Sequence, residues 1–178
     1  MCEQYELMIE QLDRVNTMLQ DFLSLAKDRL REPTLVSLTT IVTRLQPMLE
    51  SEAYLAGIRL QIDAEETPEF LVCPDDIQQL LLNLYRNALE ATPVGGSVLV
   101  KVGLEGEQAY LKVSDTGCGM TPELLAKVGT PFMTTKPNGT GLGMVQCMNI
   151  AKSYGAKLAI KSQPRQGTCV TVSFPISN

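Results

Sequence analysis

The stretch at residues 134–144, TTKPNGTGLGM, decides how the second half of this 178-residue chain is read. Three glycines stand at alternate positions, Gly139, Gly141 and Gly143, and an apolar helical pattern follows them. Glycines before a helix suit a bound phosphate, because the backbone can approach closely and the first N–H groups of the helix can donate. The spacing is neither a P-loop nor a dinucleotide fingerprint, since Gly-Lys-Ser/Thr is missing and no clear strand precedes it. The stretch alone indicates either a nucleotide loop or a glycine loop that caps a helix.

The composition excludes several classes of protein. Hydrophobic residues make up 44% of the chain, so a core can form and wholesale disorder is not expected. The formal net charge of −5 argues against a broad surface for nucleic acid or anionic membranes, although it allows local binding of an anionic nucleotide. No apolar run reaches the roughly 20 residues that a membrane helix needs. The first residues lack the basic and apolar segments of a signal peptide.

The chain contains five cysteines and no histidine. The cysteines form no C-x-x-C and are odd in number, which suits reduced thiols in a cytoplasm better than disulfides or a zinc site. Without histidine, Ser-His-Asp and Cys-His catalysis and histidine-based metal sites are excluded. Any chemistry must therefore use carboxylates, amides, Lys or Arg side chains and a cofactor. The cysteines are Cys2, Cys73, Cys118, Cys147 and Cys169.

The first 30 residues carry apolar side chains at alternating steps of three and four. These steps form a heptad seam without Pro or Gly, so we expect one long helix that packs against partner helices. About three heptads are present, which leaves a helical bundle, an extended coiled coil and an amphipathic helix lying on its own domain as alternatives. The helix should end near Pro33, which disfavours helical backbone at Glu32. The seam consists of Tyr5, Met8, Leu12, Val15, Leu19, Phe22 and Ala26.

After residue 33 the pattern changes to alternating helices and strands. Caps, breakers and periodicity predict helices at 37–57, 74–91, 122–128 and 142–155, and strands at 58–64, 69–73, 98–104, 109–115, 156–163 and 168–176. The order predicts an α+β fold, a two-layer sandwich preceded by a helical arm. About 25 residues after Asp115 form a polar, glycine-containing segment, and a loop of that length inside a compact domain is usually a lid.

Two asparagines lie four residues apart in the predicted helix at 74–91, so Asn83 and Asn87 share one face of it. Amides among leucines cost stability unless they are hydrogen-bonded. One interpretation is a pair of buried amides that bond nearby backbone. The other is a ligand for a hard cation, because a carboxamide oxygen suits Mg²⁺, which takes its remaining ligands from water and phosphates.

A carboxylate also ends an apolar strand, where Asp115 runs into Gly117 and Gly119. Such a carboxylate can accept hydrogen bonds from a flat polar ligand, and it can equally belong to an ordinary turn. Thr168 follows Gly167 at the start of the last strand and means little alone.

The order of these features along the chain is more specific for one family than any single feature is. An Asn-bearing helix, a strand ending in D-x-G-x-G, a loop, a G-x-G-x-G that opens a helix and a Gly-Thr strand follow one another. This order resembles the ATP-binding domain of sensor histidine kinases, in the superfamily shared with gyrase B, MutL and the heat-shock-90 chaperones. The resemblance covers about residues 35–177 and extends to the nitrogen-regulation and sporulation branch, where FFTTK before GTGLGL is typical and this chain has FMTTK and GTGLGM.

The resemblance implies a Bergerat-type ATP-binding fold, with a mixed sheet and helices on one face. Residues 33–178 would be the kinase catalytic domain, and residues 1–32 would be the second helix of an incomplete dimerisation and phosphoacceptor bundle. ATP and Mg²⁺ would be the cofactors.

The resemblance also implies roles for individual residues. Asn87 would coordinate Mg²⁺ with Asn83 in support, and Asp115 would accept from the adenine amine in a pocket shaped by Gly117 and Gly119. Thr168 would reach the same network through water, and Phe132 would be the aromatic residue of the lid. Further nucleotide contacts would come from Arg86, Met120, Thr135, Lys136, Gly139, Thr140, Gly141, Leu142, Gly143 and Met144.

Arg86 is the weaker phosphate candidate, since it can equally be a solvated helix residue. Many relatives carry Lys and Tyr three and four residues after the magnesium Asn, whereas this chain has Glu90 and Ala91, so Lys136 gains importance. Gyrase-type ATPases place a Glu general base where this chain has Asn83, which cannot take a proton near neutral pH. We therefore expect weak hydrolysis and a phosphoryl donor.

The acceptor should be a histidine upstream of Cys2, so we interpret the chain as a fragment with no certain catalytic residue of its own. The expected partners are a response regulator or phosphorelay protein and a second copy through the N-terminal helix, without nucleic acid. A membrane would be reached only through upstream regions. The alternatives are a protein serine kinase or ATPase of the same superfamily and a non-catalytic nucleotide-binding dimerisation module.

Overall fold

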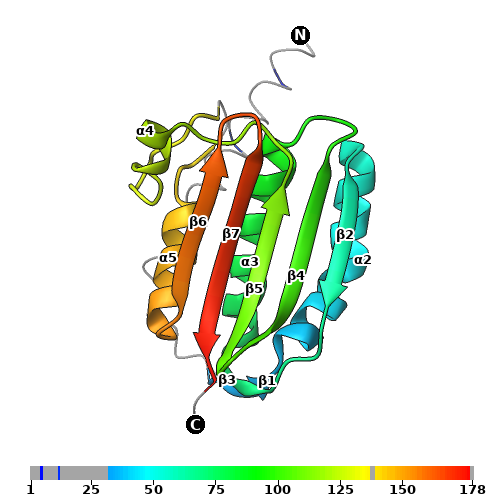
Figure 1. Cartoon of the computed structure of the whole chain (residues 1–178), viewed down its shortest axis with the longest axis vertical. Helices are drawn as coiled ribbons and strands as arrows, with labels where there is room; N and C mark the ends of the chain where they lie inside the picture. Colours follow the sequence, from blue (N-terminus) through cyan, green and yellow to red (C-terminus); the bar gives the residue numbers. More distant parts are fainter. Residues whose placement is uncertain (1–4, 6–11, 13–31, 137–138, 177–178) are drawn as a thin grey trace.

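A five-stranded mixed sheet, with helices packed on one face, forms the body of the molecule (Figure 1). The computed structural model describes residues 5, 12, 32–136 and 139–176. The strands follow the order β2-β4-β5-β7-β6; β2 and β4 are parallel, and all other neighbours are antiparallel. They span β2 Arg59–Ala64, β4 Ser97–Glu105, β5 Gln108–Asp115, β6 Lys157–Gln163 and β7 Gly167–Pro175. This arrangement confirms the predicted α+β two-layer fold.

The helices begin and end close to the predicted residues. They span α2 Leu38–Ala56, α3 Pro74–Ala91, α4 Pro122–Leu125 and α5 Gly143–Ser153. The Ser37 hydroxyl accepts a hydrogen bond from the Thr40 amide at 3.1 Å, which caps α2 at its start. Gly57 ends α2 in the left-handed conformation, with φ of 66°. Only α4 is clearly shorter than predicted, since a single turn follows its Thr121 cap.

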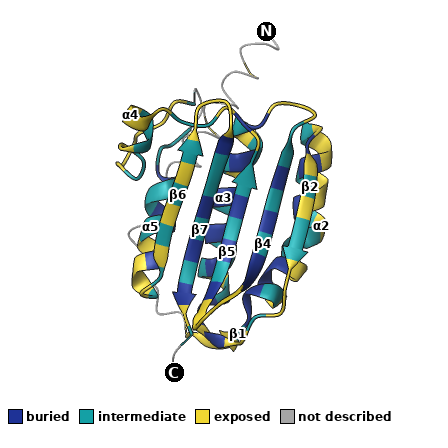
Figure 2. Ribbon diagram, in the orientation of Figure 1, coloured by how far each residue is buried: buried dark blue, intermediate teal, exposed yellow. Residues whose placement is uncertain are grey.

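The core lies between the sheet and α3, which crosses behind its centre (Figure 1). Buried residues form bands across β4, β5 and β7, while the outer strands β6 and β2 are more exposed (Figure 2). Tyr85 of α3 is fully buried, and its hydroxyl donates to the Leu49 carbonyl of α2 at 2.5 Å. Burial raises the pKa of Tyr85 to about 12, so this phenol stays a donor and fixes α2 against α3.

A short strand, β1 (Thr34–Val36), was not expected from the sequence. It pairs antiparallel with β3 (Phe70–Val72), and the two form a separate ribbon. Three residues are too few for a visible period-two pattern. Its partner strand begins 36 positions later, at Phe70 against Thr34. Pairing with that strand, and not a local sequence pattern, therefore defines β1.

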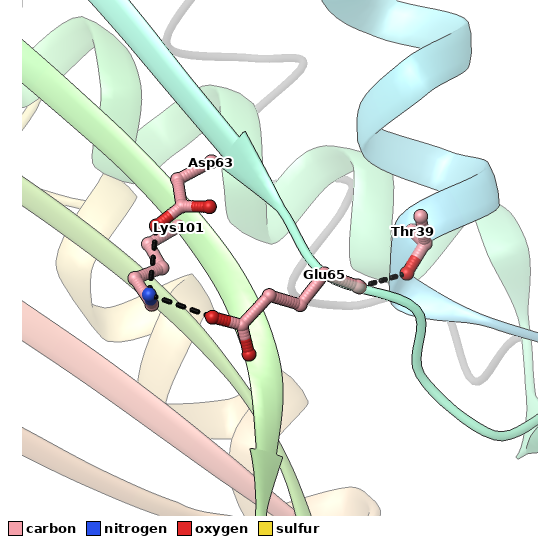
Figure 3. A network of polar contacts seen from close by, with 4 residues as sticks. All are labelled: Thr39, Asp63, Glu65 and Lys101. Carbon is pink, nitrogen blue, oxygen red and sulfur yellow. Dashed lines mark hydrogen bonds and ion pairs between the residues drawn. The ribbon is translucent and has the colours of Figure 1, made fainter.

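Polar contacts tie β2 to its neighbours on the side of the sheet away from the helices (Figure 3). The Lys101 ammonium of β4 donates to Asp63 at 2.7 Å and to Glu65 at 2.9 Å. The Thr39 hydroxyl, in the first turn of α2, donates to the Glu65 carbonyl at 2.6 Å. Hydrogen bonds from Lys101 to Asp63 and then to Glu65 hold the pKa of this ammonium well above its usual range. The edge strand is thereby anchored to both layers.

The predicted N-terminal helix and its heptad seam lie outside the described residues, apart from Tyr5 and Leu12, which are helical and exposed. The division into residues 1–32 and 33–178 therefore stays a prediction. Within the described part of the chain, no helix is long and apolar enough to cross a bilayer. The cysteines described there are free thiols, namely Cys73, Cys118, Cys147 and Cys169.

Candidate functional site

Asp115, Gly117 and Thr168 lie together at one end of the sheet, where β5 ends beside the C-terminus of α3. The Cys118 amide donates to the Ala91 carbonyl at 3.0 Å, which joins the loop after β5 to the last turn of α3. The Arg165 amide donates to the Cys118 carbonyl at 2.7 Å, which joins the same loop to the turn between β6 and β7. Three segments that are distant in sequence thus surround Asp115.

The Asp115 carboxylate is held by backbone amides on one side. Its Oδ1 accepts from the Gly117 amide at 2.8 Å and from the Thr168 amide at 3.2 Å. Burial raises the pKa of this carboxyl, and the two amide hydrogen bonds oppose the rise. Among the described residues, no donor reaches its Oδ2. An oriented acceptor oxygen therefore remains for a ligand.

Glycines allow the close packing of this loop. A Cβ on Gly119, which has φ of 63°, would overlap the Gln163 carbonyl oxygen of β6. A Cβ on Gly167, which has φ of 92°, would overlap the Asp115 carbonyl oxygen. Both positions combine a left-handed backbone with contact against another main chain, so only glycine fits them. Gly119 therefore lies against the turn between β6 and β7, and its role in shaping an adenine pocket stays a prediction.

Ser162 of β6 joins the same network, and the sequence analysis missed it. Its hydroxyl lies 2.9 Å from the Thr168 hydroxyl, accepts from the Met120 amide at 2.9 Å and contacts the Gly167 carbonyl at 3.1 Å. One hydroxyl therefore fixes both Met120 and Thr168 beside Asp115. A signal existed, because Ser162 continues the inward alternation of Leu158 and Ile160 and is the polar member of that row.

Asn87 and Lys136 lie in direct contact. The Lys136 ammonium donates to Asn87 Oδ1 at 2.8 Å and forms an ion pair with Glu90. The backbone of Lys136 is also held, since its amide donates to the Thr134 hydroxyl at 3.1 Å. The oxygen that the sequence assigned to a metal therefore already attracts a positive charge.

Asn83 bonds to residues of α5, whereas Asn87 bonds to Lys136. Its side-chain nitrogen donates to Gln146 Oε1 at 2.7 Å and to the Gly143 carbonyl at 3.4 Å. The Gln79 side chain donates to Asn83 Oδ1 at 3.3 Å. Asn83 is thus a hydrogen-bonded, half-buried amide. Its side chain joins α3 to the first turn of α5.

Arg86 points away from the other site residues. Its guanidinium pairs with Glu52 of α2 at 3.2 Å, and about half of its side chain is exposed. This placement fits the solvated helix residue that was the alternative to a phosphate contact.

The segment between α4 and α5 carries the remaining predicted residues. Phe132 is 69% exposed and has φ of 65°, a conformation that costs a non-glycine residue energy. A Cβ on Gly141 would meet the Phe132 carbonyl carbon at 2.5 Å, so this glycine lets the two ends of the segment approach. Thr135 is exposed, whereas Leu142 is buried and its amide donates to the Thr140 hydroxyl at 3.4 Å. Gly139 and Met144 are half-buried, and Met144 packs against the core.

The arrangement fits a magnesium nucleotide. Among the described residues, no cluster of three His, Cys, Asp or Glu side chains could hold a metal ion alone. A site with one amide oxygen suits Mg²⁺, because that ion keeps several waters and completes its shell with phosphate oxygens. Asn87 Oδ1 accepts a hydrogen bond from the Lys136 ammonium, which a metal ion on this oxygen would have to displace.

A sequence model of the family described as "Histidine kinase-, DNA gyrase B-, and HSP90-like ATPase" matches residues 73–178. That range contains α3, Asp115 and the glycine-rich stretch. The chain belongs to this family. Members of the histidine kinase-like ATPase family among curated proteins include sporulation kinase D of Bacillus subtilis (strain 168), which is 34% identical over 175 residues. The alignment covers 97% of this chain and 35% of that kinase, so the chain spans about a third of its length.

Solved structures show the same fold in this family. The nucleotide-free catalytic domain of histidine kinase ThkA is 26% identical with a TM-score of 0.74, over 83% of this chain and 99% of that one. Full-length ShkA in complex with AMPPNP is 22% identical with a TM-score of 0.81, over 93% and 36% of the two chains. ThkA in complex with the response regulator TrrA is 24% identical with a TM-score of 0.78, over 96% and 50%. The likeness to ShkA and to the TrrA complex concerns the fold.

Proposed function

We propose that this chain is the ATP-binding catalytic domain of a sensor histidine kinase, and that it donates the γ-phosphate of ATP to a histidine outside these 178 residues. The observation that carries the proposal is the Asp115 carboxylate, fixed by the Gly117 and Thr168 amides at the end of a buried strand. Its second oxygen is available for the adenine amine. Membership of the histidine kinase-like ATPase family supports the choice of nucleotide.

The residues around Asn87 would hold the phosphates. Bound Mg²⁺ would neutralise the charge of the triphosphate, with Asn87 Oδ1 as its protein ligand. Lys136 lies within reach of the same place and would supply a positive charge to the phosphate oxygens. The Asn83–Gln146 hydrogen bond would keep the first turn of α5 in position to donate backbone N–H groups. Catalysis would then consist of positioning and charge stabilisation.

The chemistry favours transfer over hydrolysis. Asn83 stands where gyrase-type ATPases place a general base, and its amide is occupied by Gln146 and Gly143. An amide cannot take a proton from water near neutral pH. The γ-phosphate would therefore be transferred to an external nucleophile and not to water. A protein serine kinase or a non-catalytic module would share the pocket, and no separate observation favours either.

Partners follow from the same proposal. The ThkA–TrrA complex supports a response regulator as the next phosphoryl acceptor. Residues 1–32 would form the second helix of a dimerisation bundle, and residues 33–178 would form the catalytic domain. The heptad seam supports a homodimer, and the domain would act in the cytoplasm.

Calorimetric titration with Mg·ATP tests the proposal. Asn87→Ala and Asp115→Ala should each lower the affinity at least about tenfold, because each removes a direct ligand contact. Asn149→Ala, an exposed asparagine on α5, should bind like the wild type and serves as the matched control. Thermal unfolding of each variant shows that the fold is intact. Unchanged affinity in both site variants would show that the nucleotide does not bind here.

A further inference from the structure

Glu90 completes a group of three side chains that the sequence analysis left unexplained. It lies three residues after Asn87 on α3, so both side chains lie on one face of the helix. The Lys136 ammonium lies between them, bonded to Asn87 Oδ1 at 2.8 Å and paired with the Glu90 carboxylate. The Lys136 side chain is about one-third exposed, so solvent screens this pair only in part.

The position of Lys136 conflicts with a metal on Asn87. Two cations on the same amide oxygen would repel each other strongly at this separation. A metal ion can therefore bind Asn87 only after the ammonium leaves. Glu90 can keep the ammonium once it leaves Asn87, because a carboxylate holds an ammonium more strongly than a neutral amide does.

Glu90 also competes with the ligand. The triphosphate and the Glu90 carboxylate are both anionic, and both attract Lys136. Nucleotide without a metal must draw the ammonium away from Glu90 by itself. Nucleotide with Mg²⁺ brings its own cation, which replaces the ammonium on Asn87, so Asn87 Oδ1 keeps a positively charged partner.

We infer that Glu90 is a positioning residue that holds Lys136 on the metal-binding oxygen of Asn87 and makes nucleotide binding depend on Mg²⁺. The inference rests on the proposed function. It assigns a role to the position where many relatives carry a lysine. Glu90 supplies no positive charge for the phosphates, as a lysine at this position would, and instead restrains the Lys136 ammonium.

The backbone around Lys136 restricts where its side chain can go. The Thr134 hydroxyl accepts from the Lys136 amide at 3.1 Å, and the Gly139 amide donates to the Lys136 carbonyl at 3.3 Å. A Cβ on Gly139 would overlap the Thr134 hydroxyl, so this glycine allows the close turn. With its amide and carbonyl held in this way, Lys136 can bring its ammonium to Asn87, Glu90 or a nearby phosphate through changes in side-chain rotamer.

The test is a set of calorimetric titrations with ATP, once in excess Mg²⁺ and once in excess EDTA, on the 178-residue chain. Glu90→Gln should raise the affinity for metal-free ATP about three- to fivefold, the size expected for releasing a partly exposed ion pair. In Mg²⁺ the same change should alter the affinity less than about twofold, because the metal already displaces Lys136. Lys136→Met should weaken the binding of metal-free ATP more than the binding of Mg·ATP, and the double variant should match Lys136→Met.

Two controls make the outcome decisive. Glu105→Gln changes the same charge at the far end of β4 and should leave both affinities unchanged. If Glu90→Gln also raises the affinity for metal-free ATP in the Lys136→Met background, Glu90 simply repels the triphosphate, and the inference is overturned. An unchanged or lower affinity of Glu90→Gln for metal-free ATP would overturn it as well. If the wild-type chain binds no ATP in Mg²⁺, the proposed function itself fails, which is a separate result.

Discussion

Asp115 carries a charge that the fold alone does not require. Burial raises its pKa, and the Gly117 and Thr168 amides only partly offset that rise. A group whose folded pKa is raised contributes favourably to stability while it is protonated, and this contribution is lost as the pH rises through the folded pKa. At neutral pH the ionised carboxylate is therefore less favourable for folding than the protonated carboxyl.

Replacement of Asp115 by Asn should separate binding from stability. Asn Oδ1 can still accept from the two amides, but its NH₂ group faces the adenine amine, so ATP affinity should fall at least about tenfold. At pH 7 the unfolding midpoint should equal that of the wild type or lie about 1–2 °C above it, because a buried charge is gone. As the pH falls and Asp115 of the wild type gains its proton, this difference should disappear.

Calorimetry and thermal unfolding between pH 7 and pH 4 measure both effects of Asp115→Asn. Asp63→Asn removes a carboxylate from the Lys101 network on the other side of the sheet and should leave ATP affinity unchanged. Wild-type ATP affinity in Asp115→Asn would contradict the assignment of the adenine contact.

Single residues were predictable from sequence where their polarity conflicts with their surroundings. Asn83, Asn87 and Asp115 stand out because amides and a carboxylate interrupt apolar runs. Ser162 and Gln146 escaped notice, since a serine in an exposed edge strand and a glutamine in a helix look ordinary. Their importance depends on neighbours 6 and 63 positions away in the chain, which no local pattern encodes.

Among the elements, helices and longer strands were predictable because they show clear periods and explicit caps. The sequence offered Ser37 or Thr39 as the cap of α2, and the structure has Ser37; the Gly57 stop and the alternation of β4 and β5 also match. The strand β1 could not be predicted, because three residues show no period-two pattern and the strand is defined by its pairing with β3. The pairing of α3 with α5 was likewise invisible, although the site depends on it.

Asn83 and Gln146 should stabilise the α3–α5 pairing as a unit. Their hydrogen bond measures 2.7 Å, and Gln146 is buried. Asn83→Ala and Gln146→Ala should each lower the free energy of unfolding by about 1–2 kcal/mol, because each removes the hydrogen bond between the two side chains. The double variant should lose less than the sum, with a coupling of about 1 kcal/mol. Urea unfolding of the four proteins completes the cycle.

ATP titrations on the same four proteins test how Asn83 serves the site. If it acts by holding α5, both single variants should weaken Mg·ATP binding to a similar degree. A large loss of Mg²⁺ dependence in Asn83→Ala alone would show instead that its amide contacts the metal shell, as the sequence resemblance implied.

At the scale of the whole molecule, the fold brings together one end of α3, the end of β5, the β6–β7 turn and the start of α5. The sequence order of the motifs predicted that they form one site, through their resemblance to a family. The distances and partners within the site depend on packing between elements far apart in the chain. The pairing of Lys136 with Asn87 and Glu90 is the clearest example, since 49 positions separate Lys136 from Asn87.

The whole chain should hold ATP without passing its phosphoryl group to itself. It contains no histidine, and Asn83 offers no general base. Loss of a base worth about 10²–10⁴-fold from a typical turnover of about 10 s⁻¹ leaves phosphate release at a few per minute or slower. Incubation with Mg²⁺ and ATP labelled at the γ-phosphate should therefore give no acid-labile label on the chain. Asn87→Ala, which should not bind Mg·ATP, supplies the background. Phosphate release at tens per minute would favour the hydrolytic ATPase, and an acid-stable label would favour the serine kinase. An acid-labile label would locate an acceptor inside these 178 residues and contradict the donor role, because such chemistry would need a nucleophile that the proposed site does not include.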